Sequence, residues 1–351
     1  DRHFWRRMME QTAPDDVDPV SNVKWRIAPS DKVATAGSCF AQHISRTLSR
    51  NGFRYFVTEA GEGLTPEQCA ERQFGTFSAR YGNIYTARQL VQLFDRAYGH
   101  FSPADTAWCR PDGRFVDPFR PQVELAGYAT EEEVRAESAR HLVSVRELFE
   151  QMDVFVFTLG LTESWLNLDD GAVFPLAPGV VAGPAETSRY GFVNFGVADV
   201  ANDIRAAVRR LRSVNGRARF IFTVSPVPLI ATYEDRHVLV STTESKAILR
   251  SAIGQAVAED GGIDYFPSYE IVTGHHTRGR YFGPDLRSVT EEGVAHVMRL
   301  FLKHYTGSIP GQAAAPVPPA AAALNEIMAE QRHLQDIVCD EEAIERHRGA
   351  A

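Results

Sequence analysis

Apolar positions follow two spacings along this chain, and the two spacings alternate. Short continuous apolar runs, which are typical of strands buried on both faces, occur at residues 32–36, 154–159, 219–224 and 263–266. Apolar residues three or four apart, as on one face of a helix, occur at residues 41–50, 86–98, 130–151, 197–211, 245–257 and 290–305. This order predicts an α/β fold with a doubly wound, mostly parallel sheet and flanking helices, in a flavodoxin-like three-layer arrangement.

Changes in composition predict how the chain is organised. Residues 1–30 are mixed and polar, and we expect an arm that lies on a domain formed by residues 31–305. Within this domain, residues 60–130 are rich in glycine, proline and aromatic residues and are expected to form an irregular insertion. Residues 306–324 form a Pro/Ala-rich linker, and residues 325–351 form an acidic, weakly helical tail. We expect the core to stay folded when the linker and the tail are removed.

Charge and cysteine content disfavour several classes of protein. The net charge of −8 and the dispersed basic residues argue against binding to nucleic acid or to an anionic membrane surface. The longest apolar run, residues 154–161, is far shorter than the roughly 20 residues that span a bilayer. The four cysteines lie far apart, which favours reduced thiols over a disulfide scaffold or a zinc site, and we expect no metal and no cofactor. A soluble, cytoplasmic protein is expected, and a chain trimmed of a leader would look the same.

Candidate chemistry follows the predicted strands, because ligands bind at the carboxyl ends of parallel strands. The segment Gly37-Ser38-Cys39 joins the first strand to the first helix, and this tight turn predicts a Ser38 hydroxyl exposed at that edge of the sheet. A serine here is also a common helix N-cap. Cys39 is a rival nucleophile, since a thiol at a helix N-terminus ionises more readily, and it equally fits a small residue buried behind the turn.

Five sequence blocks resemble those of one known family. They are Ala36-Gly37-Ser38-Cys39-Phe40-Ala41, Thr158-Leu159-Gly160-Leu161-Thr162-Glu163, Thr223-Val224-Ser225-Pro226-Val227-Pro228, Ser245-Lys246-Ala247 and Tyr265-Phe266-Pro267-Ser268-Tyr269-Glu270. In this order across residues 30–305, the blocks resemble the GSCFA family, which is regarded as related to the SGNH (GDSL-type) hydrolases. The resemblance implies a bacterial-type α/β protein in which a serine after the first strand attacks an ester. It also implies an oxyanion hole, completed by a glycine after the second strand and an asparagine after the third, and a base in an Asp-x-x-His before the last helix.

Carried over residue by residue, the resemblance implies Ser38 as the nucleophile, with its own backbone N–H in the oxyanion hole. Gly82, followed by the secondary candidate Asn83, matches the glycine, and a Gly-Asn pair is also an ordinary turn. In the block Gly160-Leu161-Thr162-Glu163, Thr162 stands in place of the asparagine, so that a hydroxyl would donate instead of an amide. Glu163 beside it is a further secondary candidate.

The expected base is where this sequence departs from the family pattern. The Asp-x-x-His falls on Asp285-Leu286-Arg287-Ser288, so that Ser288 stands where the histidine is expected. Ser288 also fits a capping box that opens the last helix at residues 288–291. Histidines on loops at the carboxyl edge of the sheet are alternative bases, namely His237, His275 and His276. We favour His237, from the loop after residues 225–228, with Asp285 as the group that orients it.

Two functions fit these motifs and the family resemblance. The first is a serine esterase or O-acyltransferase that acts on a carbohydrate or another hydroxylated substrate through a Ser38 acyl-enzyme, as in polysaccharide modification. Aromatic residues expected near the site are a platform for a sugar or part of the core; they are Tyr81, Tyr85, Trp165 and Tyr233. The second is a binding or scaffold protein on a decayed hydrolase fold, which the missing histidine favours. Phosphate or nucleotide binding at Gly37 is disfavoured, because the chain has no GxGxxG or Walker pattern. The acyl group, the acceptor and the oligomeric state stay open.

Overall fold

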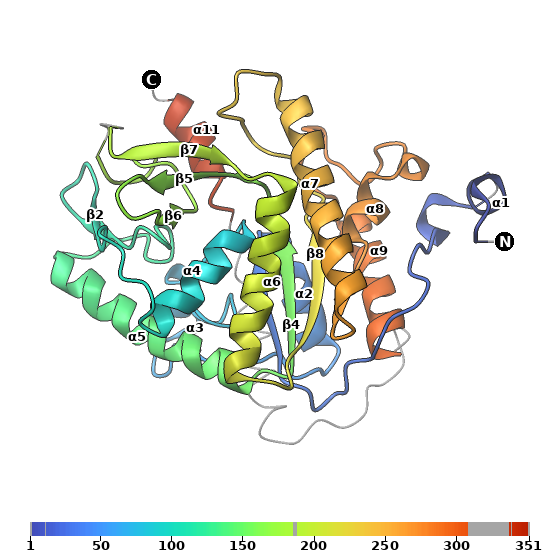
Figure 1. The fold of residues 1–351 in the computed structure, drawn as a ribbon, viewed down its shortest axis with the longest axis horizontal. Helices are drawn as coiled ribbons and strands as arrows, with labels where there is room; N and C mark the ends of the chain where they lie inside the picture. Colours follow the sequence, from blue (N-terminus) through green and yellow to red (C-terminus); the bar gives the residue numbers. More distant parts are fainter. Residues whose placement is uncertain (1, 11, 185–187, 308–336, 338, 350–351) are drawn as a thin grey trace.

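A four-stranded parallel sheet forms the centre of the protein (Figure 1). The computed structural model describes residues 2–10, 12–184, 188–307, 337 and 339–349. The strands pair in the order β1 (Val33–Gly37), β4 (Val154–Leu159), β8 (Arg219–Val224) and β9 (Ile263–Tyr265). An isolated parallel bridge joins Val33 to Tyr55 on the free edge of β1. After β1, the chain therefore passes along one side of β1 at Tyr55 and later adds β4 on the other side. This reversal is typical of a doubly wound sheet and confirms the predicted fold class.

Helices cover both faces of this sheet, as its buried strands require. One face packs against α4 (Ala87–Ala97), α5 (Glu131–Gln151), α6 (Val197–Val214) and α7 (Val238–Glu259). The other face packs against α2 (Ala41–Arg50), α8 (Ser268–Thr273) and α9 (Glu291–Phe301). Alternate side chains of a strand point to opposite faces, so Phe155 and Phe157 enter the first core, whereas Val154 and Val156 enter the second.

Short elements surround these three layers. They are α1 (Trp5–Met9), η1 (Pro14–Asp16), α3 (Pro66–Glu71), β2 (Trp108–Cys109), β3 (Phe115–Val116), η2 (His275–Thr277) and η3 (Leu302–Thr306). A second sheet, which is antiparallel, has the strand order β6 (Val173–Phe174), β5 (Glu163–Asn167) and β7 (Tyr190–Asn194). Because β5 begins one short turn after β4 ends, this sheet lies at the carboxyl edge of the central sheet (Figure 1).

The start of one helix and the N-cap of another differ from what the sequence pattern predicts. The helix expected at residues 245–257 is longer, because α7 starts directly after His237, whose Nδ1 accepts a hydrogen bond from the Leu239 N–H at 3.1 Å. The loop after β8 is correspondingly shorter. The last helix is capped by Thr290, whose hydroxyl accepts from the Gly293 N–H at 3.3 Å. The capping box expected with Ser288 as the N-cap is therefore wrong, because the N-cap is Thr290 and the helix begins at Glu291.

The described residues 339–349 lie at the carboxyl edge of the sheet, where Figure 1 shows α11. Most of the expected linker and the first part of the tail, residues 308–336, lie outside the described residues. Residues 339–341 are buried, and α11 (Glu342–Gly349) follows them. The sequence did not predict this return of the tail to the body of the protein. No helix in the described part of the chain is long and apolar enough to cross a membrane.

Candidate functional site

Ser38 lies at the junction of β1 and α2, where the sheet reverses its winding. A Cβ on Gly37, whose φ is +128°, would overlap the backbone of Thr158 on β4, so only glycine fits this position. The Ser38 N–H donates to the Thr158 carbonyl oxygen at 3.0 Å. This N–H therefore extends the sheet, whereas the sequence comparison placed it in an oxyanion hole. The helix itself starts at Ala41 with Phe40 in the N-cap position, so Ser38 is not the N-cap of α2.

The Ser38 hydroxyl is buried, which corrects the expectation of an exposed group. The residue is 3% exposed, and its Oγ has no hydrogen-bond partner among the described residues. Gly160 packs closely against both Ser38 and Tyr85. A Cβ built on Gly160 would lie 3.3 Å from the Ser38 Cβ and 2.8 Å from Cδ1 of Tyr85. Buried hydroxyls without a partner are rare in folded proteins, since burial without a hydrogen bond costs free energy. The Tyr128 and Thr158 hydroxyls also have no partner among the described residues, so it is the place of Ser38 at the sheet reversal that makes its hydroxyl a candidate.

The segment from Gly82 to Tyr85 runs between the carboxyl ends of β1 and β4. The Ile84 N–H donates to the Gly37 carbonyl oxygen at 2.9 Å, and the Gly160 N–H donates to that of Tyr85 at 2.8 Å. Gly82 has a φ of +68° and turns the chain into this position. Ligands of doubly wound sheets bind at this kind of reversal. Asn83 and Tyr85 are thus held beside the residue that follows Gly37.

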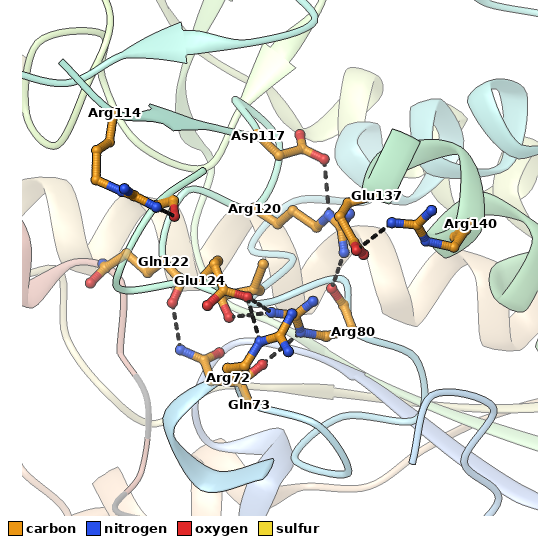
Figure 2. A network of polar contacts seen from close by, with 12 residues as sticks. Arg72, Gln73, Arg80, Arg114, Asp117, Arg120, Gln122, Glu124, Glu137 and Arg140 are labelled. Carbon is orange, nitrogen blue, oxygen red and sulfur yellow. Dashed lines mark hydrogen bonds and ion pairs between the residues drawn. The ribbon is translucent and has the colours of Figure 1, made fainter. Parts of the chain in front are cut away.

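A network of buried polar groups fixes the backbone just before Gly82 (Figure 2). The Arg80 guanidinium, at 1% exposure, donates to the Arg72 carbonyl oxygen at 2.6 Å and pairs with Glu124 at 2.9 Å. Arg120 in turn donates to the Arg80 carbonyl oxygen at 3.2 Å and pairs with Asp117 at 2.9 Å. Residues from Arg72 to Glu124 therefore hold this part of the chain in place, and no pattern in the sequence predicts these long-range contacts.

Asn83 holds a carboxyl group from the C-terminal tail. Its side-chain amide and its backbone N–H both donate to the Asp340 carboxylate. Burial raises the pKa of the Asp340 carboxyl to about 7, and the two hydrogen bonds from Asn83 oppose this rise. The Asp340 N–H donates to the Tyr85 hydroxyl at 3.1 Å. Two N–H donors of the segment beside Ser38 therefore bind a carboxyl group of the tail.

Lys246 is a buried cation that the sequence comparison did not single out. It is 1% exposed and comes from α7, and its Nζ donates to the Gly160 carbonyl oxygen at 2.5 Å. Burial lowers the pKa of its ammonium group to about 8, and the nearby Glu341 carboxylate partly opposes this change. The preceding Ser245 accepts from the Thr162 N–H at 3.0 Å. Its place in the Ser245-Lys246-Ala247 block was the signal available in the sequence.

Thr162 and Glu163 anchor loops around the site. The Thr162 hydroxyl donates to Oδ1 of Asn194 at 2.7 Å, so its proton is directed at the second sheet. The Glu163 carboxylate accepts from the Thr232 hydroxyl at 2.6 Å and from the Tyr233 N–H at 3.1 Å. These bonds fasten the loop after β8 to the start of β5. The structure therefore gives both residues partners that position backbone segments.

His237 and Asp285, which were favoured as the base and the group that orients it, each bond within their own turn. His237 is exposed and caps α7 through its Nδ1. The Asp285 carboxylate accepts from the Ser288 hydroxyl at 2.5 Å and from the Arg287 N–H at 3.0 Å. His275 lies in η2 against Trp5 of the N-terminal arm, with ring centroids 6.5 Å apart. Burial lowers the pKa of the neighbouring His276 imidazole.

Cys39 is buried behind the turn, at 6% exposure. Its thiol shares a hydrogen bond with Cys339 of the tail, and this bond and burial raise the pKa of Cys39 well above its ordinary value. The Cys39 thiol is therefore a poorer nucleophile than a thiol at an open helix N-terminus would be.

Comparisons with known proteins agree with the sequence blocks. No curated protein gives a match to this chain. The family model of the GSCFA family matches residues 32–301, from the start of β1 to the end of α9. This match spans the whole central sheet, Ser38, Asn83 and Lys246, and on this evidence the chain belongs to the GSCFA family.

Proposed function

We propose that this protein is a serine esterase or O-acyltransferase that acts on a carbohydrate or another hydroxylated substrate through a Ser38 acyl-enzyme. The observation that carries the proposal is the buried Ser38 hydroxyl, which has no hydrogen-bond partner among the described residues, beside the two N–H donors of Asn83. A nucleophile next to donors for a negatively charged oxygen is the arrangement that acyl transfer needs.

Asn83 is the proposed oxyanion-binding residue. When a serine attacks an ester carbonyl, negative charge develops on the carbonyl oxygen, and fixed N–H donors stabilise it. The hydrogen bonds from the Asn83 amide and backbone N–H support this role, because they favour the charged form of the Asp340 carboxyl against the opposing effect of burial. In this proposal, Asp340 leaves Asn83 before an acyl substrate binds.

Lys246 is the proposed proton acceptor. An amine accepts a proton only when neutral, and with a pKa of about 8 roughly half of the Lys246 side chains are neutral at pH 8. Its Nζ bonds Gly160, the residue that packs against Ser38. Serine–lysine pairs are a known variant of serine nucleophile activation. His237, with Asp285, is the alternative base, from the end of the loop after β8.

The substrate side of the site is proposed to include an aromatic cluster at the second sheet. Trp165 on β5 lies 5.2 Å from the Tyr233 ring and 6.2 Å from the Phe192 ring, measured between centroids. Glu163, at the start of β5, also bonds the Tyr233 N–H. Aromatic faces beside polar groups suit the apolar face and the hydroxyls of a sugar ring, which supports a hydroxylated substrate.

A fluorophosphonate probe tests the nucleophile directly. We expect covalent labelling of Ser38 in the wild-type chain and loss of labelling in Ser38→Ala. The matched control is Ser213→Ala, on the exposed side of α6, which is expected to keep wild-type labelling. A wild-type chain that is neither labelled nor active on small acyl esters would favour the alternative, a binding or scaffold protein. That alternative is supported by the histidine missing at Ser288 and by the tail on Asn83.

A further inference from the structure

Arg287 has a fixed orientation that is set by groups outside the C-terminal tail. It lies in the turn at residues 283–288, where the Asp285 carboxylate accepts from the Arg287 N–H at 3.0 Å. Leu286 in this turn has a φ of +54°, which is uncommon for a residue other than glycine and indicates that surrounding contacts hold the turn. Nε of Arg287 donates to the Pro228 carbonyl oxygen at 3.2 Å, in the loop after β8. The guanidinium is therefore directed by the loops at the carboxyl edge of the sheet.

The outer nitrogen of this guanidinium binds a carboxylate of the tail. Nη2 of Arg287 and Oε2 of Glu341 lie 3.0 Å apart, and the two side chains are 18% and 11% exposed. A guanidinium suits a carboxylate because its planar N–H donors match the positions of the two oxygens. The neighbouring Leu286 is 71% exposed, so the turn that carries the guanidinium is at the surface. The ion pair therefore lies just below the protein surface.

This ion pair belongs to the same end of the sheet as the candidate nucleophile. Glu341 directly follows Asp340, whose N–H donates to the Tyr85 hydroxyl at 3.1 Å. The Tyr85 ring and Ser38 both pack against Gly160. The tail therefore holds a carboxylate next to residues that pack around Ser38.

The Glu341 carboxylate supplies negative charge to two cations. It acts on the buried Lys246 ammonium group as well as on the Arg287 guanidinium. The proposed function requires Asp340, and Glu341 with it, to leave before an acyl substrate binds. Withdrawal of a carboxylate from partly buried cations costs free energy, because burial limits the compensation that water provides. A substrate that brings its own carboxylate restores this compensation, whereas a neutral substrate does not.

We propose that Arg287 determines specificity by binding a carboxylate of the substrate in the place that Glu341 occupies in this structure. The substrate is an anion, and its carboxylate belongs to the acyl group, as in a succinyl ester, or to the sugar, as in an ester of a uronic acid. Both carry the chemistry that a guanidinium recognises. Because the acidic tail holds the same position, it is displaced by a substrate of like charge and excludes a neutral one. The preference among esters rests on the proposed function, whereas the binding of a carboxylate at Arg287 does not.

The binding of a carboxylate is tested without catalysis, in the full-length Ser38→Ala variant. Amide hydrogen exchange over residues 339–349 is measured in sodium succinate, sodium glucuronate and sodium chloride at one ionic strength. We expect one of the two carboxylates to accelerate exchange about twofold or more over chloride, because it releases Glu341 from Arg287. Arg287→Gln in the same background is expected to exchange at one rate in all of these salts. Equal exchange in these salts with Arg287 present would overturn the proposal.

The preference among esters is tested with two matched pairs of substrates. The acyl pair is nitrophenyl hemisuccinate and nitrophenyl acetate, and the sugar pair is the acetyl esters of methyl glucuronoside and methyl glucoside. We expect kcat/KM to favour the carboxylate member of one pair by about tenfold or more, and that pair identifies which part of the substrate carries the carboxylate. Arg287→Gln is expected to lose activity on the carboxylate member alone. Arg287→Lys, which keeps the charge, is expected to retain part of the preference.

Arg209→Gln, on the exposed side of α6, is the matched control for the loss of a positive charge and should keep the wild-type preference. A wild-type protein that is active without preference in either pair would contradict the assignment. An equal loss of activity on both members of a pair in Arg287→Gln and Arg287→Lys would do the same, since it would show that Arg287 acts only through the fold. A wild-type protein that is inactive on every ester would instead count against the proposed function, and the exchange measurement in Ser38→Ala would still decide whether Arg287 binds a carboxylate.

Discussion

The Asp340 carboxyl group accepts hydrogen bonds from both the side-chain amide and the backbone N–H of Asn83. Asn83 lies in the segment between the ends of β1 and β4, and Asp340 belongs to the tail that ends the chain. The tail thus fills the position at the sheet reversal where doubly wound proteins bind their ligands. This relationship places residues from the end of the chain beside the candidate nucleophile Ser38.

Ser38→Ala is expected to abolish ester hydrolysis while leaving the thermal midpoint nearly unchanged. Loss of a nucleophile that acts in a catalytic unit costs several orders of magnitude in kcat. The hydroxyl has no hydrogen-bond partner among the described residues, so its removal breaks no bond and relieves a buried polar group. Initial rates on small acyl esters and a thermal melt check both parts. If Ser38→Ala stayed active while Cys39→Ala lost activity, the nucleophile would be the thiol.

Lys246→Met is expected to reduce kcat/KM strongly, because the buried methionine retains the packing and lacks the amine. In the wild-type enzyme, kcat/KM is expected to rise as the pH increases through about 8, since only the neutral amine accepts the Ser38 proton. A pH–rate profile of both proteins is the measurement. Circular dichroism of Lys246→Met provides the folding control. An active Lys246→Met together with an inactive His237→Ala would move the base to the histidine that the sequence comparison favoured.

The sequence predicted the central sheet because each of its strands is a continuous apolar run, as at residues 154–159, and such runs are read locally. It did not predict β5 and β7, whose short strands carry Glu163 and Asn194 among apolar residues. The contacts of Asp340 with Asn83 also escaped prediction, because they join residues far apart in the chain. Lys246 was missed because a lysine in a helical pattern is ordinarily a solvated residue, and only the packed structure buries it.

Arg80→Ala is expected to destabilise the fold by about 3–5 kcal/mol, because it leaves the Glu124 carboxylate with reduced charge compensation in a buried network. The Arg80 guanidinium also holds the backbone of Arg72. Arg140→Ala is the matched control, since Arg140 is 67% exposed and its pair with Glu137 contributes at most about 1 kcal/mol. Denaturant unfolding of both variants measures the difference. Equal midpoints would show that the network in Figure 2 does not stabilise the fold.

Docking of the buried residues 339–341 is expected to weaken as the pH rises. The pKa of the docked Asp340 carboxyl, about 7, lies above its ordinary value of 3.8 because of burial. A group with a raised pKa contributes fully below its ordinary value, and this contribution is lost as the pH rises through about 7. Burial raises the pKa of the Glu341 carboxyl too, while Arg287 opposes that rise. Both acids therefore act in the same direction.

The measurement is amide exchange over residues 339–349 in the reduced protein, divided by the intrinsic rate at each pH. Exchange is expected to be faster at pH 8 than at pH 5. Asp340→Asn is expected to remove much of this difference, because an amide does not titrate and its oxygen still accepts from Asn83. A variant that keeps the full pH dependence would assign it to Glu341 instead.

Removal of residues 308–351 is expected to leave a folded core in which Ser38 reacts faster with a fluorophosphonate. Among the described residues, the two cores on either side of the sheet are built from residues up to Tyr305, so we expect them to stay packed without the tail. The truncation exposes the Asn83 donors and takes the Glu341 carboxylate away from Lys246 and Arg287. Because Glu341 favours the charged form of Lys246, its loss increases the fraction of neutral amine, and hydrolysis should rise with labelling. Gln122→Ala in the full chain removes the hydrogen bond to the Asp340 carbonyl oxygen and keeps residues 339–341 in the chain. This variant should give an intermediate labelling rate. A truncated protein that aggregates or melts without cooperativity would show instead that the tail is part of the folded domain.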